Sequence, residues 1–347
     1  MRKFIISIIS LTLIITCSNP NSNIETESKN KFAIVIHGGA GGIKREYFTE
    51  EQVKAYEIKL EEALDTGYQI LDKGGASIEA IQAAIIIMED SPLFNAGKGA
   101  VYNSDAKQEM DAAIMDGATL NAGTIAGVNH IKNPILAARV VMDSSKHVML
   151  SGEGAVILAK KYGIEMVDSS YFYTEKRLNQ LLKIQGVETT KLDHTTYLKH
   201  HNLIDDHKYG TVGAVAIDKN GNIAAGTSTG GMTNKKYGRI GDVPIVGAGT
   251  YANNQTAGIS ATGTGEFFIR TVAAHEVSNL IKYKEYTPSE ALNEVLFNQI
   301  GPLGGEGGMI LIDSNGEVFW DFNSTGMFRG YKKSDGTQKI AIFEKEI

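Results

Sequence analysis

Two threonine-rich stretches lie 16 residues apart near the middle of the chain. The first is Gly210-Thr211, which opens the apolar run TVGAVAID, and the second is TSTGG, residues 227–231. A threonine hydroxyl is a weak nucleophile unless a base removes its proton. An N-terminal threonine carries that base itself, because its α-amino group has an ordinary pKa of about 7.7–8.0. Thr211 could therefore act as a nucleophile only after cleavage of the Gly210–Thr211 bond.

The residues before this bond suit such a cleavage. Gly210 leaves little steric bulk around the carbonyl that the Thr211 hydroxyl would attack, and a long polar segment precedes it. The same residues also fit a simpler interpretation, in which Thr211 is only the first residue of a buried strand. Composition alone favours that simpler interpretation.

Other familiar catalytic patterns do not occur in the sequence. The eight histidines form no HExxH motif, and there is no CxxC or P-loop. His37 opens a glycine loop, where a histidine is more often structural than a base, and His200-His201 lies in the polar segment and reads as solvated. Asp111 and Asp116 stand five residues apart on one predicted strand, so they face opposite sides and do not suit a carboxylate pair.

The elements that must position these residues can be read along the chain. An apolar strand runs through residues 32–42 into a glycine loop, and the capping box Thr49–Gln52 opens a helix that Gly74-Gly75 ends. A second helix begins at Ser77. Further strands are predicted at EMDAAIMDG, TVGAVAID, NIAAGTST, VPIVGAGTYA, AGISATGTG, GMILID and VFWDFN, with a helix over EFFIRTVAAHEVSNLI. Strands that cluster in runs favour α+β layers over a doubly wound sheet.

Length, charge and the first residues limit the class of protein. The chain has 347 residues and a formal net charge of -6 with no basic stripe, which argues against a nucleic-acid partner. Arg2 and Lys3 precede an apolar run at residues 4–16, which is too short for a transmembrane helix, and the only cysteine, Cys17, follows at once.

This start resembles a bacterial lipoprotein signal, in which residues 1–16 are removed and Cys17 is lipidated. We expect residues 17–30 to form a polar tether and the protein to be exported as a periplasmic or cell-envelope lipoprotein. An ordinary secretory signal and a secreted protein are the alternative. A lone cysteine leaves no intrachain disulfide.

Several long motifs carry a resemblance to a known family. GTVGAVAID, GTSTGGMTNKKYGRIGDVPIVGAGTYA and SATGTGEFFIR resemble signature blocks of the plant-type asparaginases, also called isoaspartyl peptidases, and IHGGAGG, LFNAGKGAVYN and MDGATLNAGTIAGV match their α-subunit blocks in order. The resemblance covers roughly residues 31–345. It implies a four-layer αββα sandwich of the N-terminal-nucleophile hydrolases. It also implies self-cleavage into an α subunit, residues 31–210 after the tether, and a β subunit, residues 211–347, paired as (αβ)2.

The resemblance also assigns roles to individual residues. Thr211 would be the nucleophile, Thr229 would orient it, and Asn95 would approach from the α subunit. Thr262 and Gly263 would shape the oxyanion site. The substrate's α-carboxylate and α-ammonium would be held by Arg239 and Asp242, with a backbone contact from Gly265. No catalytic cofactor is implied. A structural sodium ion would be bound by backbone carbonyls of Met88, Glu89, Ser91, Phe94, Ala96 and Lys98.

The implied reaction is hydrolysis of the side-chain amide of L-asparagine and of N-terminal β-aspartyl dipeptides, with release of aspartate. A glycosylasparaginase is the alternative, although that branch resembles TSTNG and ATGNGD where this chain has TSTGG and ATGTGE. A surface lipoprotein that keeps the fold only for binding is an alternative of another class, against which the intact site residues argue.

Overall fold

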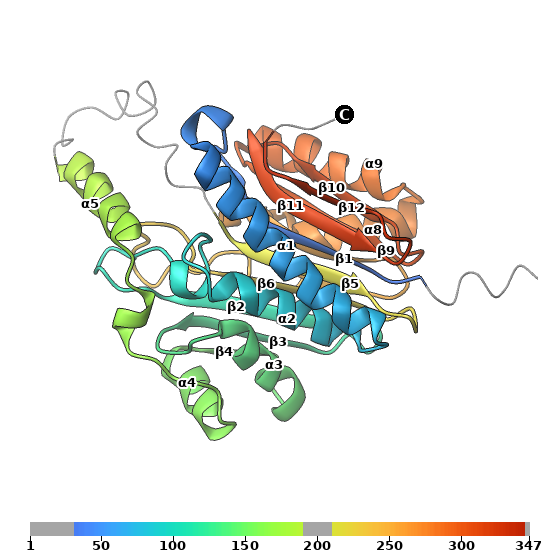
Figure 1. Cartoon of the computed structure of the whole chain (residues 1–347), viewed down its shortest axis with the longest axis horizontal. Coiled ribbons are helices and arrows are strands. Elements are labelled where there is room, and N and C mark those ends of the chain that lie inside the picture. The colour runs from blue at the N-terminus through green and yellow to red at the C-terminus, as the bar shows by residue number, and fades with distance from the viewer. Residues whose placement is uncertain (1–30, 190–209, 344–347) are drawn as a thin grey trace, which may run out of the picture.

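The computed structural model describes residues 31–189 and 210–343 (Figure 1). The predicted signal, the tether, Cys17 and the pair His200-His201 lie outside the described residues. Within these two ranges, no helix combines the length and the apolar character needed to cross a membrane.

The described strands form two sheets. The larger has eight strands in the order β12-β11-β1-β5-β6-β2-β3-β4, and the smaller has four in the order β10-β9-β8-β7. Neighbouring strands are antiparallel except for the parallel pair β3–β4. The bounds are β1 Ala33–Gly41, β2 Met110–Asp116, β3 Ala122–Val128, β4 Met149–Ser151, β5 Val212–Ile217, β6 Ile223–Thr229, β7 Thr250–Ala252, β8 Ala257–Gly263, β9 Gly307–Asp313, β10 Val318–Phe322, β11 Gly326–Lys333 and β12 Gln338–Ala341.

Helices cover the outer face of each sheet. The bounds are α1 Glu50–Asp72, α2 Ser77–Glu89, α3 Pro134–Ser144, α4 Gly152–Lys161, α5 Glu175–Thr189, α7 Gly265–Thr271, α8 Ala273–Lys284 and α9 Pro288–Asn293, followed by a π-helical segment, Glu294–Ile300. In Figure 1, α1 and α2 cross the larger sheet, and α8 and α9 lie on the far side of the smaller one.

Strand periodicity explains the layers. Along β1, Ile34 and Ile36 pack with the core under α1, α2 and α3, whereas Ala33 and Val35 belong to the core between the two sheets. Along β9, Leu311 packs against α8 and α9, whereas Ile310 and Ile312 face the larger sheet. Successive side chains of a strand point to opposite faces, so a strand buried on both sides is apolar throughout. The predicted αββα sandwich is therefore confirmed.

One predicted feature, the Thr49 capping box, was correct in detail, and two predicted elements were not. The Thr49 capping box is present, with Gln52 N donating to Thr49 Oγ1 at 3.2 Å and Thr49 N donating to Gln52 Oε1 at 3.0 Å. The predicted strand VPIVGAGTYA is extended only at β7, because residues 243–249 turn around the Asp242 carbonyl, which accepts from Ile245 N at 3.0 Å. The helix predicted over EFFIRTVAAHEVSNLI breaks at Val272, whose φ is 50°.

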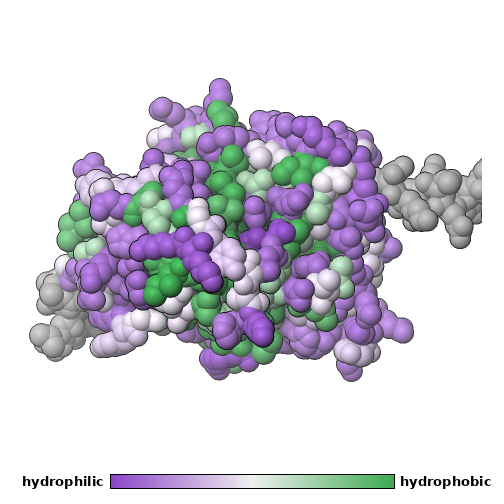
Figure 2. Space-filling model, turned by 90° about the horizontal axis from the view of Figure 1, so that it is seen from below, coloured by the Kyte–Doolittle hydropathy of each residue, from purple (hydrophilic) through white to green (hydrophobic). Residues whose placement is uncertain are grey.

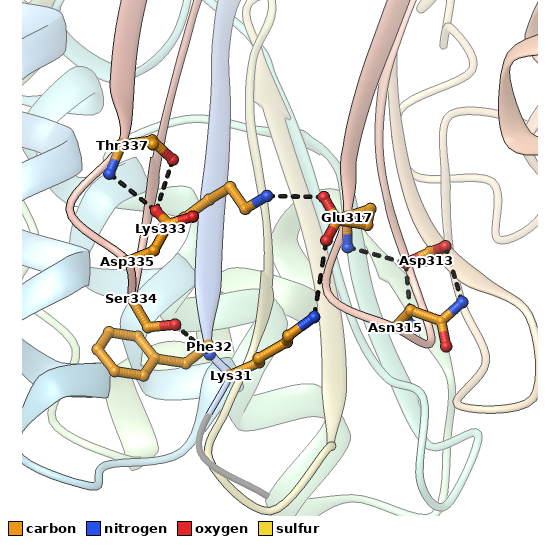
Figure 3. Close-up of polar contacts among 9 residues, drawn as sticks. All are labelled: Lys31, Phe32, Asp313, Asn315, Glu317, Lys333, Ser334, Asp335 and Thr337. Carbon is orange, nitrogen blue, oxygen red and sulfur yellow. Dashed lines mark hydrogen bonds and ion pairs between the residues drawn. The ribbon is translucent and has the colours of Figure 1, made fainter. Parts of the chain in front are cut away.

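Polar contacts join the two sheets at the end where β1 begins (Figure 3). Lys333 Nζ lies 2.6 Å from Glu317 Oε2, and Lys31 Nζ lies 4.0 Å from Glu317 Oε1. Phe32 N donates to Ser334 Oγ at 3.3 Å. These contacts join the start of the first strand to the β9–β10 and β11–β12 turns. The glycine-rich part of β1 lies at the other end of the strand.

Candidate active site

The predicted nucleophile lies beside a second threonine. Thr211 immediately precedes β5, and its Oγ1 is 3.0 Å from Thr229 Oγ1 at the end of β6. The β5–β6 ladder pairs Val212 with Ser228, so the next position along it places Thr211 opposite Thr229. Gly231 N donates to Thr229 Oγ1 at 3.0 Å, which fixes the hydroxyl that lies beside Thr211 Oγ1.

The predicted scissile bond is held by backbone contacts that only glycine permits. The Gly210 carbonyl accepts from Asn95 N at 2.8 Å. Gly210 has a φ of 114°, and a Cβ on it would lie 2.6 Å from Asn95 N. A Cβ on Gly39, whose φ is 111°, would lie 2.4 Å from Gly210 Cα. The Asn95 N–H thus points at the oxygen on which negative charge would develop if Thr211 attacked this carbonyl.

Asn95 approaches the centre through its backbone, and its side chain braces the surrounding loops. Its Nδ2 donates to Gly231 O at 2.7 Å, and its Oδ1 accepts from Val101 N at 2.9 Å. The residue thereby connects the scissile carbonyl with the loop that fixes Thr229.

Thr262 and Gly263 reach the same region from the smaller sheet. They end β8, and Thr262 Oγ1 accepts from Ala40 N at 3.3 Å. Ala40 follows Gly39, which packs on Gly210. The structure therefore brings Thr262 to the glycine loop beside the predicted scissile bond, whereas Gly263 packs on Glu306, Phe268 and Gly307.

The predicted substrate anchors also converge. A Cβ on Gly265 would lie 2.7 Å from Asp242 Oδ1 and 3.0 Å from Arg239 Nη2. A Cβ on Gly231, which contacts Thr229, would lie 3.6 Å from Arg239 Nη1. The guanidinium, the carboxylate and a side-chain-free backbone position thus share one cradle next to the two threonines. This geometry suits a ligand that carries both a carboxylate and an ammonium group.

The two charged groups of this cradle differ in their partners within the described residues. Arg239 makes a bidentate pair with Glu266, from Nε to Oε1 at 2.8 Å and from Nη2 to Oε2 at 3.0 Å. Asp242 is buried, and its Oδ2 has no hydrogen-bond partner in the described part of the chain. Burial raises the pKa of Asp242 to about 7, although Arg239 opposes the rise. An unpaired buried carboxylate is a strong acceptor for an ammonium group.

Buried charges around the threonines were not identified from the sequence. Asp111, opposite Thr229 in the β2–β6 ladder, accepts from Gly127 N at 2.8 Å, and burial raises its pKa. Lys235 Nζ donates to Glu109 O at 2.7 Å. Asp116, the last residue of β2, instead accepts from Thr119 Oγ1 of the following turn at 2.6 Å, so the two aspartates form no pair.

The segment Met88–Lys98 folds into a compact loop after α2. Burial raises the pKa of Glu89 to about 8, and its Oε1 accepts from Ser228 Oγ at 2.6 Å and from Ile135 N at 3.0 Å. A Cβ on Gly97 would lie 2.4 Å from Glu89 O, and one on Gly99 would lie 2.0 Å from Phe94 O. The Glu89 carbonyl thus lies beside Gly97 and the Phe94 carbonyl beside Gly99, and carbonyl oxygens are suitable ligands for a hard cation.

Comparisons with known proteins identify the family of this chain. Residues 30–342 match the family described as asparaginase. The chain is 45% identical over 316 residues to the isoaspartyl peptidase of Salmonella typhimurium, covering 91% of this chain and 100% of that protein. It is 42% identical to the plant-type L-asparaginase of Pyrococcus furiosus, covering 87% and 96% of the two chains. The isoaspartyl peptidase/L-asparaginase of Xenopus laevis is 37% identical, with 91% and 96% covered. The chain therefore belongs to the asparaginase family that includes the isoaspartyl peptidases and plant-type L-asparaginases.

Proposed function

We propose that this protein hydrolyses the side-chain amide of L-asparagine and N-terminal β-aspartyl dipeptides, releasing L-aspartate. The observation that carries the proposal is the cradle of Arg239, Asp242 and Gly265 beside the Thr211–Thr229 pair. Relatives named isoaspartyl peptidase or L-asparaginase support it. Glycosylasparaginase is not favoured, because the chain carries TSTGG and ATGTGE in place of that branch's motifs.

The reaction follows from the groups at the site. The free α-amino group of Thr211 takes the proton of its own hydroxyl, and Oγ1 attacks the side-chain amide carbon. The leaving amine departs with a proton, and a β-aspartyl ester on Thr211 forms. Water, deprotonated by the same α-amino group, then cleaves the ester. Arg239 and Asp242 hold the substrate's α-carboxylate and α-ammonium throughout.

Maturation requires the precursor to cut itself between Gly210 and Thr211. The 2.8 Å contact from Asn95 N to the Gly210 carbonyl supports this step. Purified protein should convert to two fragments, the smaller beginning Thr-Val-Gly-Ala-Val. Thr211→Ala should stay one band on a denaturing gel, because it has no hydroxyl to attack. A wild-type chain that remains intact after prolonged incubation would contradict the scheme.

Arg239→Ala tests the substrate class. Removing one partner of a buried charge interaction costs a few kcal/mol, so kcat/KM for asparagine and β-Asp-Leu should fall about a hundredfold or more. Self-cleavage should change far less, because the Gly210 carbonyl needs no α-carboxylate recognition. Unchanged asparagine hydrolysis would remove Arg239 as the anchor. Strong activity only on asparagine bearing N-acetylglucosamine would favour the glycosylasparaginase reaction instead.

We also propose a sodium ion in the Met88–Lys98 loop, supported by the family resemblance and by the close approach of the glycines in this loop to the Glu89 and Phe94 carbonyls. An (αβ)2 assembly is a further proposal. Figure 2 shows apolar patches on one face of the molecule. Exposed apolar side chains lie at the open β4 edge and on α4, namely Val148, Met149, Ile157 and Tyr162. Analytical ultracentrifugation of the cleaved protein tests the assembly.

Export with a lipid on Cys17 remains a proposal drawn from the first residues of the sequence. Cys17→Ser should move the protein from the membrane fraction to the soluble fraction of its host. A wild-type protein that is already in the soluble fraction would favour simple secretion.

A further inference from the structure

A chain of hydrogen bonds runs through the buried interior and ends on the nucleophile. His37 Nδ1 lies 3.1 Å from Thr211 O, and His37 Nε2 lies 2.9 Å from Ser260 Oγ. Ser260 Oγ is 2.7 Å from Thr227 Oγ1, which is 2.6 Å from Thr250 Oγ1. The side chains of His37, Ser260, Thr227 and Thr250 have no solvent exposure.

Strand register builds this chain across the two sheets. His37, Gly213 and Thr227 lie side by side on β1, β5 and β6. Ser260 and Thr250 are paired on β8 and β7 of the smaller sheet. A Cβ on Gly213 would lie 2.3 Å from His37 Nε2 and 2.0 Å from Ser260 Oγ. The absence of a side chain at Gly213 therefore makes room for the histidine to reach the serine.

Donor and acceptor rules give the chain one direction. The Thr211 carbonyl can only accept, so His37 Nδ1 must carry a hydrogen. Burial lowers the pKa of His37 to about 3, so the imidazole is neutral and Nε2 must accept from Ser260. Ser260, having donated, accepts from Thr227, and Thr227 accepts from Thr250.

The far end of this hydrogen-bond chain, at Thr250, lies beside the segment that follows the predicted substrate anchor Asp242. Thr250 Oγ1 is 3.4 Å from Val243 O, and Thr227 Oγ1 is 3.3 Å from Gly249 O. These two distances are longer than those that join the members of the hydrogen-bond chain from Thr211 to Thr250. Gly249 N in turn donates to Asp242 O at 3.2 Å. One buried array thus contacts both the nucleophile and the loop around Asp242.

We infer that His37 is a positioning residue for Thr211, held in its Nδ1–H tautomer by Ser260, Thr227 and Thr250. Cleavage after Gly210 frees the α-amino side of Thr211. The hydrogen bond from His37 to the Thr211 carbonyl then keeps the Cα in place, and with it both the α-amino group and the hydroxyl. His37 contacts neither Oγ1 nor the cradle, so it acts through Thr211. The inference rests on the proposed role of Thr211 as nucleophile.

Ser260→Ala tests the inference, with Ser278→Ala as a matched control. Ser278 Oγ lies 2.6 Å from Thr256 Oγ1 in another buried serine–threonine pair, which has no contact with His37. Ser260→Ala should lower kcat on the order of tenfold or more with KM changed less than about threefold, because the substrate anchors stay intact. Ser278→Ala should leave both values near wild type. Equal kinetics of the two variants would overturn the inference.

A direct measurement of the tautomer keeps the test decisive if Ser260→Ala fails to fold. Nitrogen-15 NMR of histidine-labelled wild type, assigned by the signals lost in His37→Gln, should show a neutral ring with hydrogen on Nδ1 near neutral pH. Thr227→Val should lower kcat less than Ser260→Ala. Hydrogen on Nε2, or a charged ring, would overturn the inference. Inactivity of wild type on asparagine would refute only the proposed function, because the tautomer is measured independently.

Discussion

Replacing Asp242 with asparagine should remove a pH-dependent cost to stability. The carboxyl group is buried and its pKa is raised to about 7, with burial as the main cause. An aspartate in the unfolded chain ionises near its usual 3.8. Asparagine has nearly the same shape and does not ionise, so the difference between the two proteins isolates this one titration.

The sign and size follow from linkage. Between about pH 4 and 7, the folded state keeps a proton on Asp242 that the unfolded state has lost, so stability falls as the pH rises. A pKa difference of about three, at 1.36 kcal/mol for each pH unit, gives a cost of up to about 4 kcal/mol above pH 7. Below about pH 4 the cost vanishes, because both states are protonated.

Thermal unfolding between pH 4 and 8 measures this cost. Both proteins should carry Thr211→Ala, which keeps each as one chain. With an unfolding entropy of about 2.1 cal/mol/K per residue, 4 kcal/mol corresponds to a Tm advantage of roughly 6 °C for Asp242→Asn at pH 8. The advantage should disappear near pH 4. Parallel Tm curves over the whole range would refute the reasoning.

The same substitution should cost activity. In the cleavable background, Asp242→Asn loses the negative charge that would pair with the substrate ammonium, so kcat/KM for asparagine should fall about a hundredfold or more at pH 8. A gain in stability together with a loss of activity is expected where a site holds an uncompensated charge for its ligand. Retention of full activity would show that Asp242 does not hold the ammonium.

Two further predictions concern other carboxylates near the site. Burial raises the pKa of Glu89 to about 8, so the Tm advantage of Glu89→Gln should grow as the pH rises from about 4.5 to 8; a difference that does not change with pH would contradict this. Glu266 occupies the Arg239 guanidinium that the substrate carboxylate needs, so Glu266→Gln should lower the KM for asparagine severalfold with kcat nearly unchanged. Steady-state kinetics at fixed ionic strength measure this, and an unchanged or higher KM would argue against competition at Arg239.

Local features were predictable because their physical causes are local. The Thr49–Gln52 capping box involves backbone groups only three residues apart, and it appears as predicted. The apolar stretch that forms β1 was predicted as a strand and is buried along its whole length, and the clustering of strands in runs already indicated α+β layers. The family could be identified because its long motifs occur in order along the chain.

Errors arose where tertiary contacts override local preference. Residues 243–249 have the composition of a strand, but the N–H groups of Ile245 and Gly249 donate to the Asp242 carbonyl and turn the backbone. The helix predicted after Gly265 bends at Val272, where a positive φ separates α7 from α8. A rule based on periodicity cannot detect a backbone direction that is set by packing against another layer.

The division at Gly210–Thr211 and the roles of the site residues stay predictions, although the structure brings these residues together. The resemblance of the sequence to the family identified Thr211, Arg239 and Asp242 as candidate site residues. Only the tertiary structure decided that Arg239 is paired with Glu266 and that Asp242 is left with an unpartnered oxygen. Only the packing of β1 against β8 made His37 the neighbour of Ser260. A pKa, a tautomer and a hydrogen-bond partner depend on burial and on residues distant in sequence, so they are determined only when the sheets come together.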